Sequence, residues 1–302
     1  MSRPIAVVSH DAGGAEILSS YLRREQPKHV LVLEGPAQRI FAAKLGKAPA
    51  LVDLKEAVRG ANWVLCGTSW QSDLEWRAIH YARELKKRSV AFLDHWINYS
   101  ERFVRDGEVC LPDEIWVGDQ EALRIASGIF KPVPIRLKVN PYFEDLRRDL
   151  AALRPPRSGP AGAKSILYVC EPIRAHALFQ HGDERHWGYV EEEALEYFIN
   201  NISAVTPQVG RVVVRPHPSE PKDKYDWIVS RTQVPIEFSR TTTLAQDVAA
   251  ADIVAGCESM AMVVGLLGGK RVVSVIPPGG RACVLPQPEI EVLRDMVLQR
   301  TA

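Results

Sequence analysis

The chain has 302 residues, 46% of them hydrophobic and 25% charged, as in ordinary soluble globular proteins with room for two domains of about 150 residues each. Lysine and arginine number 38 against 37 acidic residues, so the net charge of +1 argues against a nucleic-acid-binding protein. The longest apolar run, residues 253–269, is interrupted by Glu258 and by glycines, so it falls short of the roughly 20 apolar residues of a membrane span. Five cysteines without a C-x-x-C pair and a start without a signal-peptide pattern predict a cytoplasmic protein.

The first half alternates apolar runs with amphipathic stretches. The runs predict strands at residues 4–9, 29–34, 62–68, 88–96, 113–119 and 134–139. The helical stretches are 16–25, 37–45, 72–87, 121–127 and 138–154. Because no hairpin signal of the Asn-Gly type separates the strands, we expect parallel βαβ units and a Rossmann-like domain.

A Pro-, Gly- and Ser-rich stretch, residues 155–164, is typical of a linker, and we place the domain boundary near residue 155. The same alternation then restarts. Predicted strands are 165–172, 212–214, 235–239, 252–257 and 270–278; predicted helices are 191–203, 225–230, 242–251, 258–268 and 288–299. A polar stretch without apolar periodicity, residues 174–190, is interpreted as a functional loop or lid that begins at Arg174. The predicted fold class is therefore α/β, with a first Rossmann-like domain at 1–155 and a second at 156–302.

Polar residues and glycines follow several of the predicted strands, at the carboxyl edge where ligands bind in open α/β sheets. Those of the first half are His10, Asp11, Gly13, Gly14, Asp94 and His95; those of the second are Glu171, Arg215, His217, Gly256, Glu258 and Ser259. Two parallel sheets whose carboxyl edges face one another across a cleft would clamp a ligand between the domains.

The turn Arg215–Ser219 reads RPHPS and follows three consecutive valines. A proline on each side of His217 restricts its backbone, so the imidazole is held in place before a ligand arrives. A protonated His217 would neutralise a phosphate, and Arg215 would assist it. The structural alternatives are a histidine that only caps the loop and an arginine paired with a carboxylate.

The second half also ends a predicted strand at Gly256 and starts a helix at Glu258 or Ser259. Free backbone amides and a hydroxyl at such a point suit a phosphate. The structural alternative for Ser259 is an ordinary N-cap. For the first half, the paired glycines Gly13 and Gly14 let the backbone pass close to another group, and the alternative for Asp11 is again an N-cap.

The RPHP turn, the Gly-x-x-Ser turn at 256–259 and the run GGKRVVSVIPP resemble the donor-binding half of bacterial GT-B glycosyltransferases of the sialyl, Kdo and capsule types. The segment KVNPYFEDL is similar to the hinge of that superfamily and of the related nucleotide-sugar epimerases and hydrolases. This resemblance implies His217 and Ser259 as contacts of a nucleotide-sugar phosphate. Val263, Val264 and Gly265 stand where many of these transferases carry a carboxylate for the ribose, so Glu258 is a candidate substitute.

The resemblance further implies a general base on an early loop, for which Asp11 is the candidate and Asp94 the reserve, with His10 as an orienting partner. We expect no metal and no cofactor beyond a nucleotide-sugar co-substrate, CMP- or UDP-linked. The implied function is a metal-independent glycosyltransferase that moves a sugar to a glycan acceptor in bacterial surface polysaccharide synthesis. Peripheral attachment to the inner membrane is compatible with it, and the oligomeric state is left open.

Two other functions remain: a nucleotide-sugar hydrolase or hydrolysing 2-epimerase, because the chain is short for an acceptor-binding insertion, and a non-catalytic GT-B-like binding protein, because the ribose carboxylate is missing. Aromatic residues near the strand ends, Trp70, Trp96 and Tyr99, are candidates for stacking on an acceptor sugar, with core packing as the alternative. Arg102 and Arg105 follow them and suit an anionic acceptor.

Overall fold

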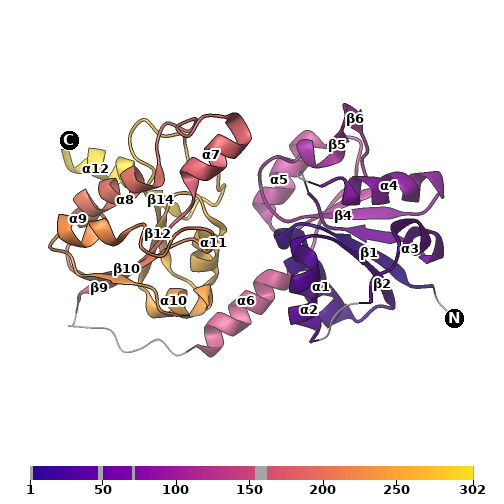
Figure 1. Cartoon of the computed structure of the whole chain (residues 1–302), viewed down its shortest axis with the longest axis horizontal. Helices are drawn as coiled ribbons and strands as arrows, with labels where there is room; N and C mark the ends of the chain where they lie inside the picture. The colour runs from indigo at the N-terminus through magenta and orange to yellow at the C-terminus, as the bar shows by residue number, and fades with distance from the viewer. Residues whose placement is uncertain (1–2, 47–49, 70–71, 154–161, 242, 302) are drawn as a thin grey trace. The chain divides into compact units, whose positions relative to one another are not determined.

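The computed structural model describes residues 3–46, 50–69, 72–153, 162–241 and 243–301. The chain divides into two compact units, Met1–Asp145 and Leu146–Ala302, each built of alternating strands and helices (Figure 1). The division falls inside helix α6 (Pro141–Ala152). The boundary expected near residue 155 lies outside the described residues, so that boundary and the cleft expected between the domains stay predictions.

The first unit contains a six-stranded sheet in which every pair of neighbouring strands is parallel, as the βαβ pattern predicts. In spatial order its strands are β2 (His29–Leu33), β1 (Ile5–Ser9), β3 (Val64–Cys66), β4 (Ser89–Leu93), β7 (Glu114–Val117) and β8 (Ile135–Leu137). The chain passes from β2 over β1 to β3, so the direction of winding reverses between β1 and β3. Ligands of doubly wound sheets bind at such a switch point.

Helices cover both sides of this sheet. Every residue of β1 is therefore buried, whichever face its side chain points to. Ile5 and Val7 belong to the core cluster that also contains residues of α1 and α2, whereas Ala6 and Val8 point to the opposite face and are completely buried. The helices are α1 (Ala12–Glu25), α2 (Pro36–Leu45), α3 (Leu54–Gly60), α4 (Leu74–Glu84) and α5 (Gln120–Ile129). The short α3 packs on α4 and is absent from the sequence prediction.

A small antiparallel hairpin follows β4, contrary to the expectation of parallel pairing alone. A 3₁₀ turn (Glu101–Phe103) leads into β5 (Val104–Arg105), which pairs with β6 (Glu108–Val109). The turn between them is Asp106-Gly107, with positive φ angles of 51° and 80°. Asp-Gly is a strong two-residue hairpin signal, so the prediction overlooked a cue that the sequence contains.

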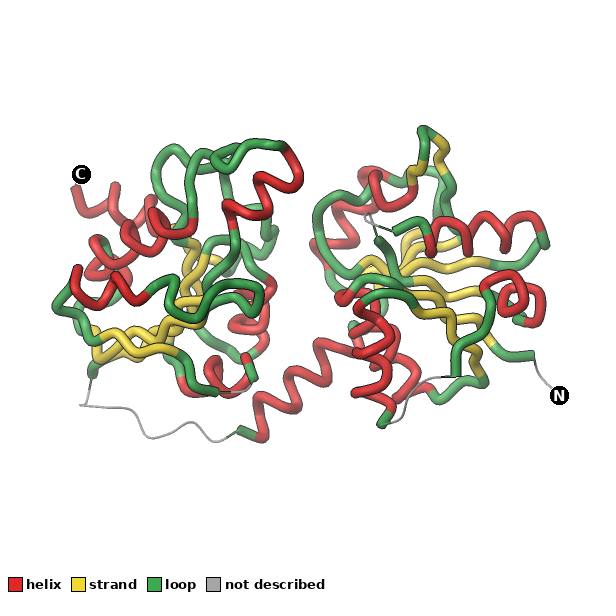
Figure 2. Tube along the Cα trace, in the orientation of Figure 1, coloured by secondary structure: helices red, strands yellow, loops and turns green. Residues whose placement is uncertain are grey.

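The second unit has a second six-stranded parallel sheet; in both units the strands lie side by side, with helices and loops outside them (Figure 2). Its spatial order is β11 (Ile236–Phe238), β10 (Val209–Arg215), β9 (Lys164–Val169), β12 (Ile253–Gly256), β13 (Arg271–Ser274) and β14 (Ile290–Val292). The winding reverses between β9 and β12, which places the switch point between the loops that follow these two strands.

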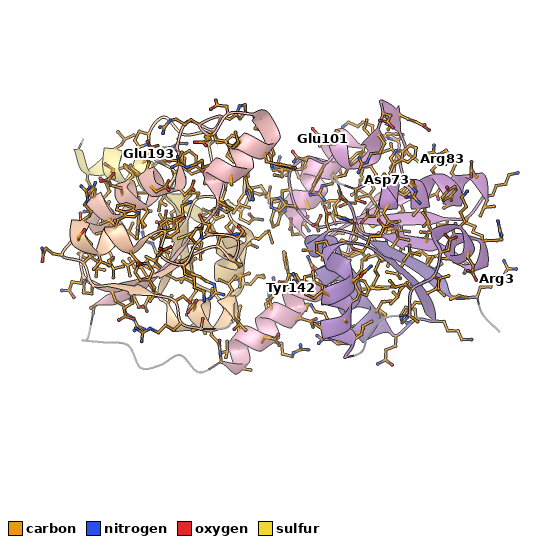
Figure 3. All side chains as sticks on the ribbon, viewed as in Figure 1. Arg3, Asp73, Arg83, Glu101, Tyr142 and Glu193 are labelled. Carbon is orange, nitrogen blue, oxygen red and sulfur yellow. The ribbon has the colours of Figure 1, made fainter. Side chains whose placement is uncertain are left out.

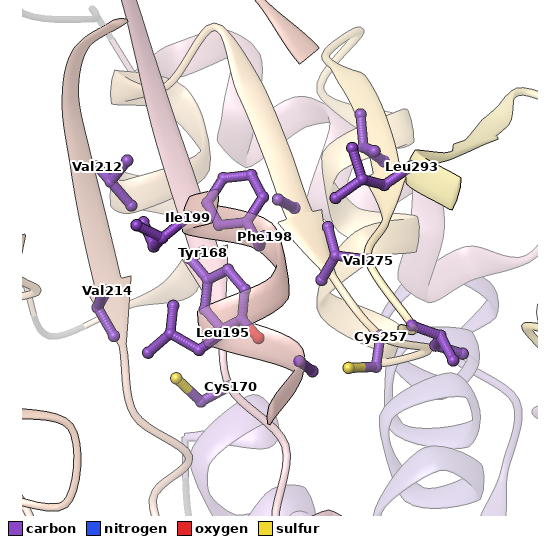
Figure 4. Packing of buried hydrophobic residues seen from close by; sticks show 14 of the residues in the cluster. Tyr168, Cys170, Leu195, Phe198, Ile199, Val212, Val214, Cys257, Val275 and Leu293 are labelled. Carbon is purple, nitrogen blue, oxygen red and sulfur yellow. The ribbon is translucent and has the colours of Figure 1, made fainter. Parts of the chain in front are cut away.

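The core of this unit lies between one face of the sheet and the helix α8 (Glu191–Asn200). Figure 4 shows Val212 and Val214 of β10 beside Tyr168 of β9, with Leu195 and Phe198 of α8 packed over them. The remaining helices are α7 (Ile173–His181), α9 (Ile202–Val205), α10 (Leu244–Ala250), α11 (Met260–Leu267) and α12 (Leu293–Thr301).

Three predictions for the second half need correction. The stretch 174–190 is not all loop, because its first part forms helix α7. Residues 226–231 form 3₁₀ turns rather than an α-helix, and the expected final helix is preceded by the edge strand β14. The overall prediction of an α/β chain with two parallel Rossmann-like domains is confirmed. No helix within the described ranges is long and apolar enough to span a membrane.

Candidate functional site

The switch point of the first unit brings two strand-end loops into contact. The loop after β1 enters α1 through Gly14, and the loop after β3 begins with Gly67. A Cβ atom on Gly14 would lie 3.1 Å from the Cα of Gly67, tighter than ordinary contacts. Glycine therefore permits the two backbones to approach closely, as expected from the paired glycines.

His10 and Asp11 form a hydrogen-bonded pair at this edge, with 2.7 Å between His10 Nδ1 and Asp11 Oδ1. Asp11 occupies the N-cap position of α1, yet its side chain accepts no hydrogen bond from the helix amides. The capping alternative is therefore not realised. His10 orients the Asp11 carboxylate, and about a fifth of each side chain remains exposed to solvent.

Glu75 of α4 lies behind this pair and was not predicted. Its Oε1 accepts a hydrogen bond of 2.7 Å from the backbone N–H of His10, and the residue is 3% exposed. Burial raises the pKa of Glu75 to about 7; the His10 N–H opposes the shift and the charge of Asp11 adds to it. Its Oε2 is buried without a partner among the described residues. An acid on the apolar face of an amphipathic helix, between Leu74 and Ala78, was the available sequence signal.

Asp94 has a different environment from Asp11. Its Oδ1 lies 2.6 Å from Arg102 Nη1, and both side chains are nearly buried, 11% and 5% exposed. Thr68 Oγ1 donates to the same oxygen at 3.2 Å, and the carboxylate lies against Gly13, where a Cβ would collide with it. Asp94 is held in a nearly buried ion pair, whereas Asp11 is partly exposed, so the geometry favours Asp11 over Asp94 as the residue that contacts a substrate hydroxyl.

His95 is half-buried beside this ion pair. Burial lowers its pKa, Asp94 opposes the shift and Arg102 adds to it. Its Nδ1 has no hydrogen-bond partner in the part of the chain that the structure describes. The predicted role of His95 in substrate binding stays a prediction.

The aromatic residues expected to stack on an acceptor belong to the core instead. Trp96 is 5% exposed and donates through Nε1 to Asp119, and Tyr99 is 2% exposed. Trp70 lies outside the described residues. Arg102 is buried in its pair with Asp94, and Arg105 donates to backbone carbonyls of the surrounding loops. Arg102 is therefore not free to hold an anionic acceptor, and the expectation for Arg105 stays a prediction.

In the second unit, the switch point is closed by Glu171, which follows β9. Its Oε1 accepts hydrogen bonds from the backbone N–H groups of Cys257 (3.1 Å) and Glu258 (2.8 Å), just before α11. Burial raises the pKa of Glu171 to about 7 and the charge of Glu258 adds to this, although the backbone donors oppose it. Amides expected to be free for a phosphate thus hold a side-chain carboxylate. Ser259 Oγ accepts from Ala261 N at 3.1 Å, as an ordinary N-cap.

Glu258 is turned away from solvent and paired with Arg281, a residue that the sequence prediction missed. The guanidinium of Arg281 also lies over the ring of Trp187, 4.1 Å from its centroid. Arg281 follows β13 at the same sheet edge, just after Gly279 and Gly280, which was the available signal. A ribose contact by Glu258 would therefore compete with this ion pair.

His217 is held by its own turn. The backbone N–H of Ser219 donates to Nδ1 at 3.2 Å, and the Ser219 hydroxyl lies 2.7 Å from the same nitrogen. An amide can only donate, so Nδ1 accepts and the proton of the neutral ring is on Nε2. Burial lowers the pKa of His217, His176 adds to this and Glu220 opposes it. The structure thus favours a neutral imidazole that donates through Nε2, instead of the protonated one expected.

The other predicted arginines are engaged in ion pairs. Arg215 Nη1 lies 2.5 Å from the carboxylate of Asp247, so Arg215 is paired as in the alternative, although the carboxylate is buried instead of lying at the surface. Arg174 pairs with Glu192 at 2.9 Å and Glu184 at 3.4 Å. Among the described residues there is no group of three or more histidine, cysteine or acidic side chains that could hold a metal ion.

No protein-family model matches the chain, and no curated protein matches it in sequence. Solved structures do match its fold. The UDP-GlcNAc 2-epimerase of Methanocaldococcus jannaschii superposes with a TM-score of 0.60 at 10% identity, over 99% of this chain and 92% of that one. The UDP-GlcNAc 2-epimerase of Neisseria meningitidis, bound to UDP-GlcNAc, gives 0.60 and 10% over 98% and 90%.

A galactoside α-2,3-sialyltransferase from Photobacterium phosphoreum also matches, with a TM-score of 0.47 and 10% identity over 98% of this chain and all of that one. A likeness at that score is too loose to support an inference about function. The UDP-GlcNAc 2-epimerases are one of the kinds of enzyme that the sequence resemblance named. The chain has the two-domain, GT-B-like fold that these nucleotide-sugar enzymes share.

Proposed function

We propose that the protein is a nucleotide-sugar enzyme, and specifically a metal-independent glycosyltransferase that moves a sugar from a nucleotide donor to a glycan acceptor. The observation that supports it best is the His10–Asp11 pair. Asp11 stands at a helix N-terminus but caps nothing, and His10 Nδ1 holds its carboxylate at 2.7 Å. A carboxylate kept available and oriented by a histidine is what a general base requires.

In the proposed reaction, Asp11 takes the proton of an acceptor hydroxyl as its oxygen attacks the anomeric carbon of the donor sugar. The bond between that carbon and the phosphate oxygen breaks, and the nucleotide leaves with the bonding electrons. His217 donates a hydrogen bond from Nε2 to the leaving phosphate, which stabilises the charge that develops there. A neutral, pre-oriented imidazole suffices for this donation because the proton is not transferred.

Glu171 affects how a donor phosphate would bind. Its carboxylate already satisfies the amides of Cys257 and Glu258, and two anions cannot share these donors without repulsion. We infer that a phosphate either contacts His217 first or displaces Glu171 from the start of α11. We place the reaction in the cytoplasm, in bacterial surface polysaccharide synthesis, with a CMP- or UDP-linked sugar as co-substrate.

The second candidate is a hydrolysing nucleotide-sugar 2-epimerase. It is favoured by the TM-score of 0.60 with two UDP-GlcNAc 2-epimerases, over nearly the whole of this chain. At 10% identity this likeness concerns the fold alone. It makes the epimerase a candidate but does not assign the activity.

Incubation with UDP-GlcNAc in the absence of any acceptor separates the two. If the protein is a transferase, free UDP should accumulate only when a glycan acceptor is added. Release of UDP together with N-acetylmannosamine in the absence of acceptor would establish the epimerase instead. Trials with CMP- and GDP-linked sugars extend the comparison to other donors.

A further inference from the structure

A cavity of about 690 Å³ opens on the first unit beside the His10–Asp11 pair. It lies between the start of α4 and the β5–β6 hairpin, and its size is within the range of small-ligand sites. Its lining residues are His10, Ser72, Asp73, Trp76, Arg105, Asp106 and Glu108. Figure 3 shows Asp73 where α4 begins, with Arg83 farther along the same helix.

The charge of this cavity is acidic. Three carboxylates line it against one guanidinium, and Arg105 already donates to the carbonyls of Glu101 and Ser69, at 3.0 and 2.7 Å. Asp106 at the hairpin tip has no hydrogen-bond or ion-pair partner in the described ranges. Asp73 and Glu108 have only weak, exposed partners, at 3.5 and 4.0 Å. Such a lining repels anions and attracts a cation.

Trp76 gives the cavity an aromatic wall. Its ring stacks on His80 with 5.3 Å between centroids and an interplanar angle of 10°, so a ligand reaches only the other ring face or the edge. An indole is the best aromatic partner for an organic cation. The Trp76 Nε1 atom is buried, so the indole presents only carbon atoms to a ligand in the cavity.

We propose that this cavity binds a protonated amine on a hydroxylated ligand, that is, an amino sugar. The carboxylates would hold the ammonium group, and Trp76 would pack against one face of the sugar ring. Because His10 lines the cavity and is hydrogen-bonded to Asp11, a sugar bound there lies next to the candidate base. The cavity is thus the acceptor subsite if the proposed glycosyl transfer is correct, and it selects cationic acceptors over anionic ones.

The test compares two trisaccharides that differ at their amino groups, which are free and charged in one and acetylated and neutral in the other. Triglucosamine, at slightly acid pH where its amines are protonated, and triacetylchitotriose are titrated calorimetrically into the full chain at low salt. We expect triglucosamine to bind at least about tenfold more tightly, which corresponds to about 1.4 kcal/mol. Equal affinities, or no binding of triglucosamine, would overturn the proposal.

Variants assign the binding to this cavity. Asp106→Asn keeps a residue that tolerates the positive φ of 51°, and Glu108→Gln preserves shape; together they should weaken triglucosamine binding about tenfold. Trp76→Phe keeps a ring and should cost less than Trp76→Ala. Asp226→Asn, an exposed acid of the second unit, is the control and should change nothing. An undiminished affinity in the Asp106→Asn, Glu108→Gln double variant would also overturn the proposal.

This binding experiment needs neither nucleotide nor turnover. If the chain binds triglucosamine but never releases nucleotide, the subsite is supported and the proposed transfer is refuted. If the chain transfers sugar but does not bind triglucosamine, the transfer is supported and the subsite is refuted.

Discussion

The carboxylate of Glu171 accepts a hydrogen bond of 2.8 Å from the backbone N–H of Glu258, across the switch point of the second sheet. The neighbouring amide of Cys257 donates to the same oxygen at 3.1 Å. A side chain of the protein thus occupies the place where an anionic ligand would meet the start of α11. Anion binding there must compete with Glu171.

Glu171→Gln should therefore strengthen the binding of UDP several-fold at pH 8, because glutamine still accepts from the amides but carries no charge. With a pKa of about 7, the wild-type carboxyl group is largely protonated at pH 6 and competes less, so the difference between the proteins should shrink. Titration calorimetry at both pH values measures this. Glu193→Gln on α8, paired with Arg185 at 2.9 Å, is the control. Weaker UDP binding by Glu171→Gln at both pH values would instead make Glu171 a direct contact of the nucleotide.

Glu75 should make the folded state less stable as the pH rises. Its pKa is about 7 in the folded chain against an ordinary value of 4.5, so the folded state holds the proton over an interval in which the unfolded chain has released it. Stability from Glu75 is complete below pH 4.5 and is lost as the pH rises to 7, in total about 3 kcal/mol. Urea denaturation from pH 5 to pH 8 measures the slope. Glu75→Gln should make the slope shallower, although Glu171, whose pKa is also about 7, still contributes to it. An identical slope in both proteins would contradict the prediction.

Asp94→Asn should lower the free energy of unfolding by about 3 kcal/mol, because it leaves the buried Arg102 without its charged partner. Asp11→Asn is the matched control. Its side chain is partly exposed and caps no helix, so we expect a change of less than about 1 kcal/mol. Urea denaturation measures the free energy of unfolding of both variants. If Asp94→Asn and Asp11→Asn lower it equally, Asp94 does not stabilise the fold more than Asp11 does.

Gly13→Ala should destabilise the fold by about 2 kcal/mol. A Cβ there would collide with the Asp94 carboxylate, which Arg102 prevents from moving aside. Gly128→Ala in α5 is the control with the opposite sign. Its Cβ would meet no atom within 4 Å, and alanine favours a helix by about 0.5 kcal/mol. Thermal unfolding that shifts both variants in the same direction would contradict this explanation.

The two parallel sheets could be predicted because buried parallel strands are continuous apolar runs and helices of this length have a clear period. Two elements were not predicted. Helix α3 has seven residues, too few for a helical period to stand out. Strand β14 lies inside the stretch 288–299, which the pattern predicted as one helix. The β5–β6 hairpin is a different case, since the Asp106-Gly107 signal was present but lay between two-residue strands.

For the candidate site, the sequence shows which residues follow each strand and hence which share an edge. It does not show how these residues pair. Arg102 is eight residues from Asp94, and Glu171 is nearly ninety from Glu258, so both contacts depend on how separate loops pack. The acidic cavity was missed for the same reason, because its walls come from the loop after β1, from α4 and from the hairpin.

Asp11 and His217 are proposed to act in sugar transfer. Their role is tested by the rate at which Asp11→Ala and His217→Ala form glycosylated acceptor from a nucleotide sugar, followed by mass spectrometry beside the wild type. We expect losses of about a hundredfold or more for Asp11→Ala and tenfold or more for His217→Ala. Transfer at the wild-type rate in both variants would contradict this proposal.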